Sequence, residues 1–362
     1  MTTHRITLIP GDGIGPEITT AMQSVLEAAG VDISWEKAEA GAHLMERLGT
    51  PLPEATIDSI RANKVAIKGP VTTPVGSGFR SVNVQLRKEL DLFVNLRPAF
   101  SLPGTGARYE DIDLVIVREN TEDLYAGIEF EEGSLEAAGL IAYCEESGAG
   151  RIRPDSGISL KPISVTGSRR IVSWACEYAL ANGRTKVTAV HKANILKYSD
   201  GLFLRVAREV GEGYAGRLQF EDRIVDACCM GLVMRPEEFD VLVLPNLYGD
   251  IISDLCAGMV GGLGIAPGAN IGEEYAVFEP VHGSAPKYAG KNVANPTAEL
   301  LSAVLMLRHL GEAEAADRIL TAIRQVLNEG TAVTYDIRRA NTGSTDGSVG
   351  TTEYSNAVIA HL

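Results

Sequence analysis

The sequence lacks the signatures of several protein classes. Its five cysteines among 362 residues are odd in number and have no CxxC or Cys/His spacing, so we expect reduced, structural thiols rather than disulfides or a zinc site. No run of lysine and arginine interrupts a chain of formal net charge −14, which argues against nucleic acid and anionic membranes as partners. No apolar run approaches bilayer-spanning length, and residues 1–5 lead directly into a strand-like run. We therefore expect a cytoplasmic protein that binds neither nucleic acid nor membrane.

The pattern that is present alternates short apolar runs with helical periodicity. Hydrophobic residues make up 45% of the chain and charged residues 22%, which is enough for two domains with sizeable cores. Strands are expected at residues 5–10, 64–68, 114–117, 186–190 and 240–244. Helices are expected at residues 18–29, 168–181, 200–210 and 298–310. This alternation predicts an α/β sheet.

Two segments interrupt the alternation. Residues 131–164 are rich in Gly, Ser and Glu with strand-like pieces, and we interpret them as an inserted β-rich arm; a mobile surface loop is the alternative. Residues 340–350 are glycine-rich and predict a loop.

Two glycine segments differ in what they predict. Residues 11–16, Gly-Asp-Gly-Ile-Gly-Pro, follow the first strand but do not fit GxGxxG, and Pro16 lacks an amide that a phosphate would use. We therefore predict a chain reversal there and no Rossmann fold. Residues 282–288, His-Gly-Ser-Ala-Pro-Lys-Tyr, place small residues beside a cation, which favours close approach of the backbone to an anionic ligand.

Three arginines lie at positions that the apolar pattern would bury. Arg87 follows Leu86, Arg97 stands between a leucine and a proline, and Arg118 ends the apolar run at residues 114–117. A guanidinium at the end of a buried strand needs an anionic partner. Several such groups on an acidic chain predict a pocket for a small molecule with several carboxylates or phosphates.

Acidic residues suggest a metal site. Asp250 and Asp254 are four residues apart after a buried strand, so on a helix they would project from one face and repel each other. A hard divalent cation such as Mg²⁺ or Mn²⁺ would relieve this repulsion. Asp226 is a third candidate ligand; the alternative roles are a capping and a solvated aspartate for Asp250 and Asp254, and a helix cap for Asp226.

Two further residues could move protons. Lys192 directly follows a predicted strand, where an α/β protein places functional groups and where a desolvated lysine can act as a base. Tyr125 lies seven residues after Arg118 and could donate a phenolic proton near the same anion, although packing is its alternative role.

Together these residues and segments resemble the decarboxylating β-hydroxyacid dehydrogenases, the family of isocitrate and isopropylmalate dehydrogenases, over essentially the whole chain. The matching blocks are residues 11–17, 80–97, 118–120, 191–194, 246–254, 261–268 and 279–287. The resemblance implies an isopropylmalate dehydrogenase-like two-domain α/β fold with a large mixed sheet flanked by helices, a smaller α/β domain and a β-rich dimer clasp. The implied parts are a large domain (1–92 and 261–362), a small domain (93–122 and 165–260) and a clasp-like arm (123–164).

The resemblance also implies a substrate. Isocitrate dehydrogenases place Ser and Asn at the positions of Ser81 and Asn83 to meet the γ-carboxylate, whereas isopropylmalate enzymes present apolar residues to an isopropyl group. The chain is similar to the isocitrate type. Arg87, Arg97 and Arg118 would then clamp the substrate carboxylates.

A homodimer with a shared active site is implied as well. Asp250 and Asp254, with Asp226 of the partner subunit, would hold Mg²⁺ or Mn²⁺ against the C1 carboxylate and C2 hydroxyl of isocitrate. Lys192, also from the partner subunit, would help deprotonate that hydroxyl while hydride passes to the nicotinamide, which gives oxalosuccinate. The metal would stabilise the enolate left by CO₂, and Tyr125 would protonate it to 2-oxoglutarate, a reaction of the tricarboxylic acid cycle.

The expected cofactor is NADP. Where NAD-dependent members carry an Asp-Ile pair, this chain has Lys287 and Tyr288, and Tyr335 and Arg339 complete the NADP-type set; solvated surface charge is the alternative. Ala294 stands where NADP types often have a larger aliphatic residue, so NAD is expected to retain some activity. The other implied cofactor residues are Thr73, Glu279, His282, Gly283, Ser284, Ala285 and Asn295.

Three alternatives remain. The chain could be a homoisocitrate or isopropylmalate dehydrogenase, or an isocitrate dehydrogenase that prefers NAD. It could also be a non-catalytic regulatory subunit, a class that loses chemical residues; the presence of Tyr125, Lys192 and the three aspartates argues against this reading.

Overall fold

The structure, a computed structural model, describes residues 3–72 and 81–362, and of Glu46 it describes only the backbone. Within these residues the strands are β1 (His4–Ile9), β2 (Ile33–Lys37), β3 (Val65–Lys68), β4 (Val94–Phe100), β5 (Asp113–Glu119), β6 (Glu129–Phe130), β7 (Ile158–Ser159), β8 (Lys186–His191), β9 (Gln219–Ile224), β10 (Val241–Leu244), β11 (Pro267–Ile271) and β12 (Ala276–Pro280). The α-helices are α1 (Gly15–Ala28), α2 (Met45–Leu48), α3 (Glu54–Asn63), α4 (Val82–Glu89), α5 (Leu135–Glu146), α6 (Val165–Ala181), α7 (Ser199–Glu212), α8 (Val225–Met234), α9 (Asn246–Val260), α10 (Thr297–His309), α11 (Ala313–Glu329), α12 (Tyr335–Thr342) and α13 (Thr351–Ala360). Short 3₁₀ helices are η1 (Ala42–Leu44), η2 (Asp123–Ala126), η3 (Pro236–Glu238), η4 (Leu263–Ile265) and η5 (Pro286–Tyr288). Each predicted strand and helix is present within one to three residues of its expected ends.

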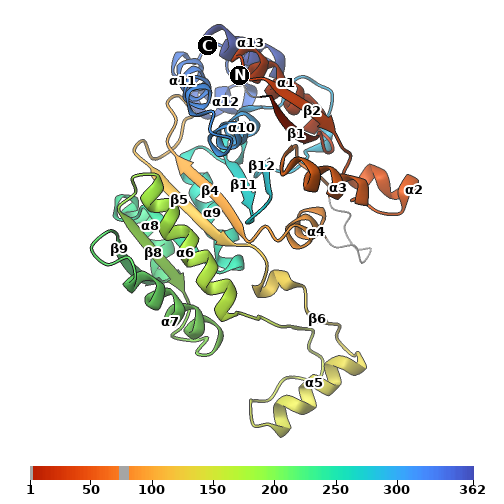
Figure 1. Cartoon of the computed structure of the whole chain (residues 1–362), viewed down its shortest axis with the longest axis vertical. Helices are drawn as coiled ribbons and strands as arrows, with labels where there is room; N and C mark the ends of the chain where they lie inside the picture. The colour runs from red at the N-terminus through yellow and green to blue at the C-terminus, as the bar shows by residue number, and fades with distance from the viewer. Residues whose placement is uncertain (1–2, 73–80) are drawn as a thin grey trace.

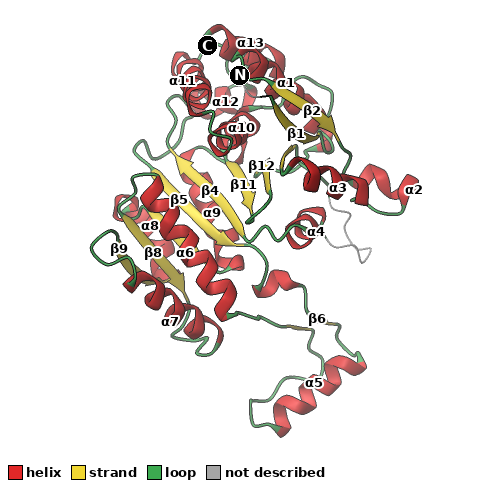
Figure 2. Cartoon of the chain, in the orientation of Figure 1, coloured by secondary structure: helices red, strands yellow, loops and turns green. Residues whose placement is uncertain are grey.

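One mixed sheet runs through the molecule (Figure 2). Among the described residues its strand order is β2-β1-β3-β12-β11-β4-β5-β10-β8-β9. The pairs at both ends of the sheet are parallel, whereas the central pairs β12–β11, β11–β4 and β4–β5 are antiparallel. The antiparallel centre distinguishes this sheet from the parallel Rossmann sheet, so the predicted mixed sheet and the rejection of a Rossmann fold are both confirmed.

Helices cover both ends of the sheet and bring distant segments together (Figure 1). Helix α9 packs on β4 and β5, and α10 packs on β11 and β12. Helix α1 packs on α13, so the two chain ends lie close together at the top of Figure 1. No helix in the described part of the chain is both long and apolar enough to cross a membrane.

The hydrophobic core is continuous across the predicted domain boundary. One cluster of buried side chains includes Ile6 on β1 and Leu244 on β10. Strands β4 and β11, which the prediction assigns to different domains, pair directly through Leu96 and Ala269. The domain limits themselves stay a prediction.

The arm is helical, and the expectation of a β-rich arm was wrong. Strands β6 and β7 are only two residues each, whereas α5 occupies 12 residues between them and projects far from the body (Figure 1). The segment of α5 is rich in Ala, Leu and Glu, which favour helix, and the Ser134 hydroxyl accepts a hydrogen bond from the Ala137 N–H as an N-cap. Apart from Gly139, which lies inside α5, the glycines and serines of the arm lie outside this helix.

The first glycine turn has the structural role that was predicted for it. Gly13 has φ +59°, and a Cβ at this residue would lie 2.0 Å from the Ser284 carbonyl oxygen. That carbonyl accepts a hydrogen bond from the Ile14 N–H at 2.9 Å. The turn therefore fastens the segment after β1 to residues 282–288, which sequence analysis singled out independently. In the tail, the first three residues of the predicted loop, 340–342, belong to α12, and the loop itself occupies residues 343–350.

Candidate active site

Two of the three arginines lie on one face of the sheet, under helix α9. Arg118 on β5 pairs in register with Asn95 on β4, and Arg97 follows Asn95 by two residues, so the three side chains share a face. Helix α9 can approach because its Gly249 has no side chain; a Cβ there would lie 2.5 Å from Cγ of Arg118. Arg87 reaches the same region from α4. The arginines thus converge, as the sequence predicted.

The acidic residues of α9 face these arginines. Arg118 forms an ion pair with Asp250 and donates to the Asn246 side-chain oxygen at 2.8 and 3.0 Å. The Nη1 atom of Arg97 lies 3.2 Å from Asp254 and 3.5 Å from Asp250. Asp250 and Asp254 therefore project from one face of a helix, which is the geometry that their spacing predicted.

Tyr125 joins this network from η2. Its hydroxyl donates to Asp250 at 2.5 Å, and the Arg118 guanidinium lies 4.8 Å from its ring centroid. Burial and the Asp250 carboxylate raise the pKa of Tyr125. Burial opposes ionisation of Asp250, but Arg118 and Tyr125 outweigh it and lower the pKa of Asp250. Burial and the neighbouring arginines lower the pKa of Arg118 to about 9.

Glu279 on β12 organises a second buried network. Lys68, at the end of β3, forms an ion pair with Glu279 at 2.5 Å, and Arg87 lies 3.6 Å from its other oxygen. Asn270 on β11 donates to Glu279 at 2.7 Å and accepts from Arg87 at 3.1 Å. Burial disfavours the carboxylate, but Lys68 and Arg87 lower the pKa of Glu279 to about 2. Glu279 is therefore ionised at neutral pH.

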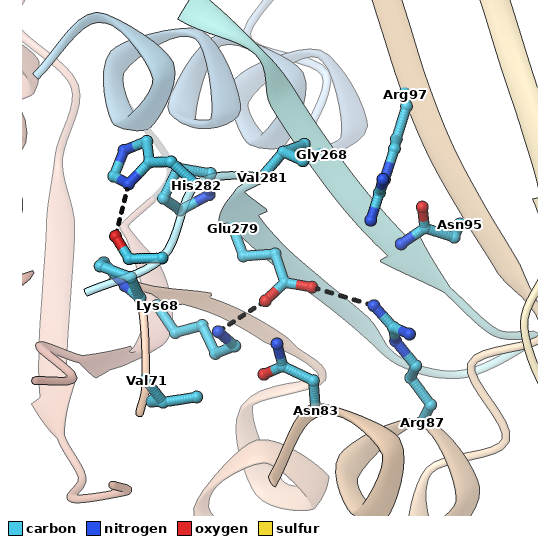
Figure 3. A pocket seen from close by; sticks show the side chains of 13 residues that line it. Lys68, Val71, Asn83, Arg87, Asn95, Arg97, Gly268, Glu279, Val281 and His282 are labelled. Atoms are coloured by element: carbon cyan, nitrogen blue, oxygen red, sulfur yellow. Dashed lines mark hydrogen bonds and ion pairs between the residues drawn. The ribbon is translucent and has the colours of Figure 1, made fainter. Parts of the chain in front are cut away.

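A pocket of about 110 Å³ lies between the two networks (Figure 3). Figure 3 shows Glu279 near its centre, with Lys68 and Asn83 below it and Arg87 and Arg97 to its right. Within the described residues, Asn83 Oδ1 and Arg97 Nε are buried without a hydrogen-bond partner. Buried polar atoms that lack protein partners suit a polar ligand. The pocket therefore fits a small anion held by several cations.

The proposed metal ligands do not form a complete site in one chain. Asp226 lies in the first turn of α8 and forms an ion pair with Lys192, whose side-chain ammonium donates to the carboxylate and lowers the pKa of Asp226. No three His, Cys, Asp or Glu side chains in the described part of the chain converge on a possible metal position. Asp250 and Asp254 supply two carboxylates on one face, a donor set that suits Mg²⁺ or Mn²⁺, and a complete metal site would need ligands besides these two.

A larger cavity of about 310 Å³ adjoins the pocket, because His282 and Gly283 line both. Of the predicted cofactor residues it is lined by His282, Gly283, Ala285, Tyr288, Asn295 and Tyr335. The rings of Tyr288 and Tyr335 lie 5.6 Å apart. Burial and Tyr288 raise the pKa of Tyr335 to about 12, and burial lowers the pKa of His282.

Lys287 and Arg339, the two cations predicted to favour NADP, are not among the residues that line this cavity. Lys287 stands 4.9 Å from the Tyr288 ring centroid, at the edge of the cavity. Arg339 is exposed one turn after Tyr335 on α12. Both cations lie beside the aromatic pair, and both side chains are exposed.

The remaining predicted residues have mixed placements. Thr73 lies outside the described residues. Ser81 occupies the N-cap position of α4, one turn before Gln85. The Ser284 hydroxyl forms a hydrogen bond with the Thr72 hydroxyl at 2.6 Å, and Ser284 is not among the residues that line the cavity.

Sequence reasoning missed several residues of these cavities. Lys68 shows the same signal as Arg118, a cation that ends a buried apolar strand, and could have been found by it. Asp336 lines the larger cavity and accepts a hydrogen bond from Asn295 at 2.8 Å. Asn270 on a short strand has no distinguishing pattern, because its role depends on the pairing of β11 with both β4 and β12.

The fold and the two cavities define an α/β protein with a small, cation-lined pocket beside a larger cavity that is lined in part by aromatic residues. A family model described as isocitrate/isopropylmalate dehydrogenase matches residues 5–358, and the chain belongs to this family. The catalytic subunit 5 of mitochondrial NAD isocitrate dehydrogenase of Arabidopsis thaliana is 48% identical over 357 residues, which cover 98% of this chain and 88% of that one. The NADP isocitrate dehydrogenase of Archaeoglobus fulgidus is 44% identical over 379 residues, covering 97% and 91%. The crystal structure of isocitrate dehydrogenase from Methylococcus capsulatus matches with a TM-score of 0.89 and 49% identity over 99% of both chains.

Proposed function

We propose that the chain catalyses the oxidative decarboxylation of isocitrate to 2-oxoglutarate and CO₂, with NADP as hydride acceptor and Mg²⁺ or Mn²⁺ as metal. The family uses NAD or NADP and a divalent metal. The observation that carries the choice of substrate is the polar lining of the smaller pocket, where Asn83, Arg87 and Arg97 surround the space. An isopropyl group would offer these side chains no hydrogen bond, whereas a third carboxylate would accept hydrogen bonds from the Asn83 amide N–H and from the guanidinium groups of Arg87 and Arg97.

The chain's own residues suit binding and proton transfer. Arg97 and Arg118 would exchange their contacts with Asp250 for substrate carboxylates. Tyr125 keeps its proton at neutral pH, because its pKa is raised, and can donate it to carbon after CO₂ leaves. Lys192 would accept the proton of the C2 hydroxyl. A divalent ion held by Asp250 and Asp254, with Asp226 of the partner subunit, would supply Lewis-acid polarisation of the C2 oxygen.

The proposed cofactor preference rests on charge near the aromatic pair. Lys287 and Arg339 would bind a 2′-phosphate, and the hydroxyls of Tyr288 and Tyr335 would donate to it. Asp336, which accepts from Asn295, lies on the same cavity and could instead favour a ribose hydroxyl. Because the Arabidopsis relative is named for NAD and the Archaeoglobus relative for NADP, preference for NAD is the second candidate.

We further propose a homodimer that shares the site. Helix α8 exposes Met230, Val233 and Met234, and α9 exposes Ile251; we take these apolar side chains as the dimer surface, with Asp226 one turn before Met230 on α8. Lys192 and Asp226 lie at this surface, away from the arginines, so a second copy could bring them to its own Asp250. Light scattering coupled to size-exclusion chromatography should give twice the chain mass of 38.6 kDa.

Absorbance of the reduced nicotinamide tests the proposal. The purified chain is mixed with Mg²⁺ and isocitrate, and with NADP or NAD in parallel; isopropylmalate and homoisocitrate replace isocitrate in matched reactions. Activity with isocitrate that favours NADP and disappears with a chelator is the expected result. Faster turnover of isopropylmalate or homoisocitrate would refute the substrate, and faster reduction of NAD would refute the cofactor.

A further inference from the structure

Lys161, at the base of the arm, forms ion pairs with two buried acids, and these contacts are electrostatic, because its Nζ atom has no hydrogen-bond partner among the described residues. Its Nζ atom lies 3.2 Å from Oδ1 of Asp123 and 3.1 Å from Oδ1 of Asp200, and 4.4 Å from the centroid of the Tyr248 ring. Both aspartate side chains are fully buried, and that of Lys161 is 14% exposed. Two carboxylates buried side by side need a nearby cation, so the ammonium keeps this cluster together.

Asp123 connects the cluster to Tyr125 and to the helix of Asp250. Asp123 opens η2, the turn that carries Tyr125, with φ +68°, and its Oδ1 accepts from the Leu124 N–H at 2.8 Å. Its Oδ2 accepts from the Leu247 N–H at 3.0 Å. Leu247 lies in the first turn of α9, where backbone N–H groups have no partner within the helix. Asp123 therefore holds the start of α9 against η2.

Asp200 connects the same cluster to Lys192. Its Oδ2 accepts from the backbone N–H of Lys192 at 2.7 Å, directly after β8 ends at His191. One ammonium thus pairs with two carboxylates: Asp123 accepts from the backbone N–H groups of Leu124 and Leu247, which neighbour Tyr125 and begin the helix of Asp250, and Asp200 accepts from the backbone N–H of Lys192.

We propose that Lys161 is a positioning residue, which aligns Tyr125, Asp250 and Lys192 through Asp123 and Asp200. This inference rests on the proposed function. Lys161 is not part of the lining of either ligand cavity, so it acts through the backbone rather than on substrate. A small displacement of catalytic groups lowers the rate of the chemical step more than it weakens binding. Loss of Lys161 should therefore lower kcat and leave the KM for isocitrate nearly unchanged.

The first test is steady-state kinetics of Lys161→Met and Lys161→Arg. We expect Lys161→Met to lower kcat by about 10- to 100-fold, with KM within about threefold, and Lys161→Arg to recover most of the rate because it restores the cation. The matched control is Lys186→Met. Lys186 has similar exposure and pairs with Glu221 at 3.0 Å, but it lies at the opposite end of β8 from Lys192. Equal effects of Lys161→Met and Lys186→Met would overturn the inference.

The second test does not depend on activity. Hydrogen exchange of the Lys192 and Leu247 amides should be at least about tenfold faster in Lys161→Met than in the wild type, and unchanged in Lys186→Met. Unchanged exchange at both amides refutes the network. If the wild type does not oxidise isocitrate, the proposed function fails, and the exchange result still decides whether Lys161 holds these backbone positions.

A double variant covers the case in which Lys161→Met does not fold. Lys161→Met with Asp123→Asn removes one positive and one negative charge, so the net charge of the cluster is kept, and Asn tolerates the positive φ of this position. We expect it to fold, with faster exchange at Lys192 and the same selective loss of kcat. Wild-type kcat in the folded double variant would contradict the inference.

Discussion

The small pocket and the larger cavity beside it are built in different ways. The pocket, about 110 Å³, is lined by charged side chains that already form buried ion pairs, such as Lys68 with Glu279. The cavity, about 310 Å³, is lined by small and aromatic residues, and its proposed selectors Lys287 and Arg339 lie at the edge or on the surface. Buried charges require partners, so the pocket is ordered before any ligand binds. Exposed cations have no such requirement, so the cavity specifies its ligand less strictly.

The largest expected effect comes from removing the cation of Arg118 from the buried charge network. Arg118→Met removes a guanidinium that is 1% exposed and leaves Asp250 without its closest cation. We expect kcat/KM for isocitrate to fall by about 1,000-fold or more. Breaking a buried pair by removing one partner also costs about 3 kcal/mol of unfolding free energy, measurable by urea titration.

The control for Arg118 is Arg169→Met. Arg169 on α6 pairs with Glu209 at 3.0 Å, and both side chains are largely exposed. Its loss should cost less than about 1 kcal/mol and leave kinetics unchanged. If Arg118→Met keeps kcat/KM within about tenfold of the wild type, the arginines do not clamp the substrate.

Removal of one hydroxyl from the same network should have the next largest effect. Tyr125→Phe keeps the ring over Arg118 but removes the O–H that donates to Asp250. We expect kcat to fall by about 100-fold, with KM within about threefold, since the lost group donates a proton and does not bind a carboxylate. Tyr109→Phe, which removes a hydroxyl that donates to the Val233 carbonyl, should have wild-type kinetics. Matching losses in both variants would rule out a proton-donor role.

The contrast between pocket and cavity also explains what the sequence could predict. Arg118 and the pair Asp250 and Asp254 were found because a charge at the end of an apolar strand, or two acids four apart, is unfavourable without a specific partner. Local patterns of this kind also located α6, α7 and α10. Such signals are read within a few residues, and they predict where a partner is needed.

What the sequence could not predict depends on long-range pairing. The contact of Lys68 with Glu279 requires β3 to pair with β12, across more than two hundred residues. Asn270 became a hub only because β11 is central in the sheet. The arm was misread because α5 has few buried residues, so its helical propensity and Ser134 cap were the only signals against a strand.

A moderate effect is expected from Lys287 and Arg339, the cations beside the larger cavity that are proposed to select the cofactor. Lys287→Gln and Arg339→Gln should each lower the ratio of kcat/KM for NADP over NAD by about tenfold, because a cation that contacts a 2′-phosphate contributes little to binding a ribose hydroxyl. Initial rates with both cofactors give this ratio. Lys291→Gln, a nearby exposed lysine, is the control. An unchanged ratio in both selector variants would assign the preference to other residues of the cavity, such as Asp336.

The smallest effect should come from Glu299, a carboxyl on α10 that is fully buried behind the pocket near Lys68 and Glu279. Neither of its side-chain oxygens has a hydrogen-bond partner among the described residues. Burial, with a smaller contribution from Glu279, raises the pKa of Glu299 to about 8 from an ordinary value of 4.5. The folded protein thus retains a proton that the unfolded chain releases near pH 4.5, so this stabilisation is complete below pH 4.5 and is lost as the pH rises to about 8.

Urea titrations of Glu299→Gln between pH 5 and pH 8 test this behaviour. Gln has no proton to lose, so the free energy of unfolding of the variant should rise relative to the wild type by at least about 1 kcal/mol over this range. Glu279 has the opposite sign: its pKa of about 2 means that its stabilisation is present above pH 4.5 and is lost on acidification, so Glu279→Gln should gain nothing between pH 5 and pH 8. The exposed Glu237→Gln should also show no such rise. If the free energy of unfolding of Glu299→Gln relative to the wild type does not change between pH 5 and pH 8, water reaches this carboxyl. The ordered, buried network then ends at Glu279.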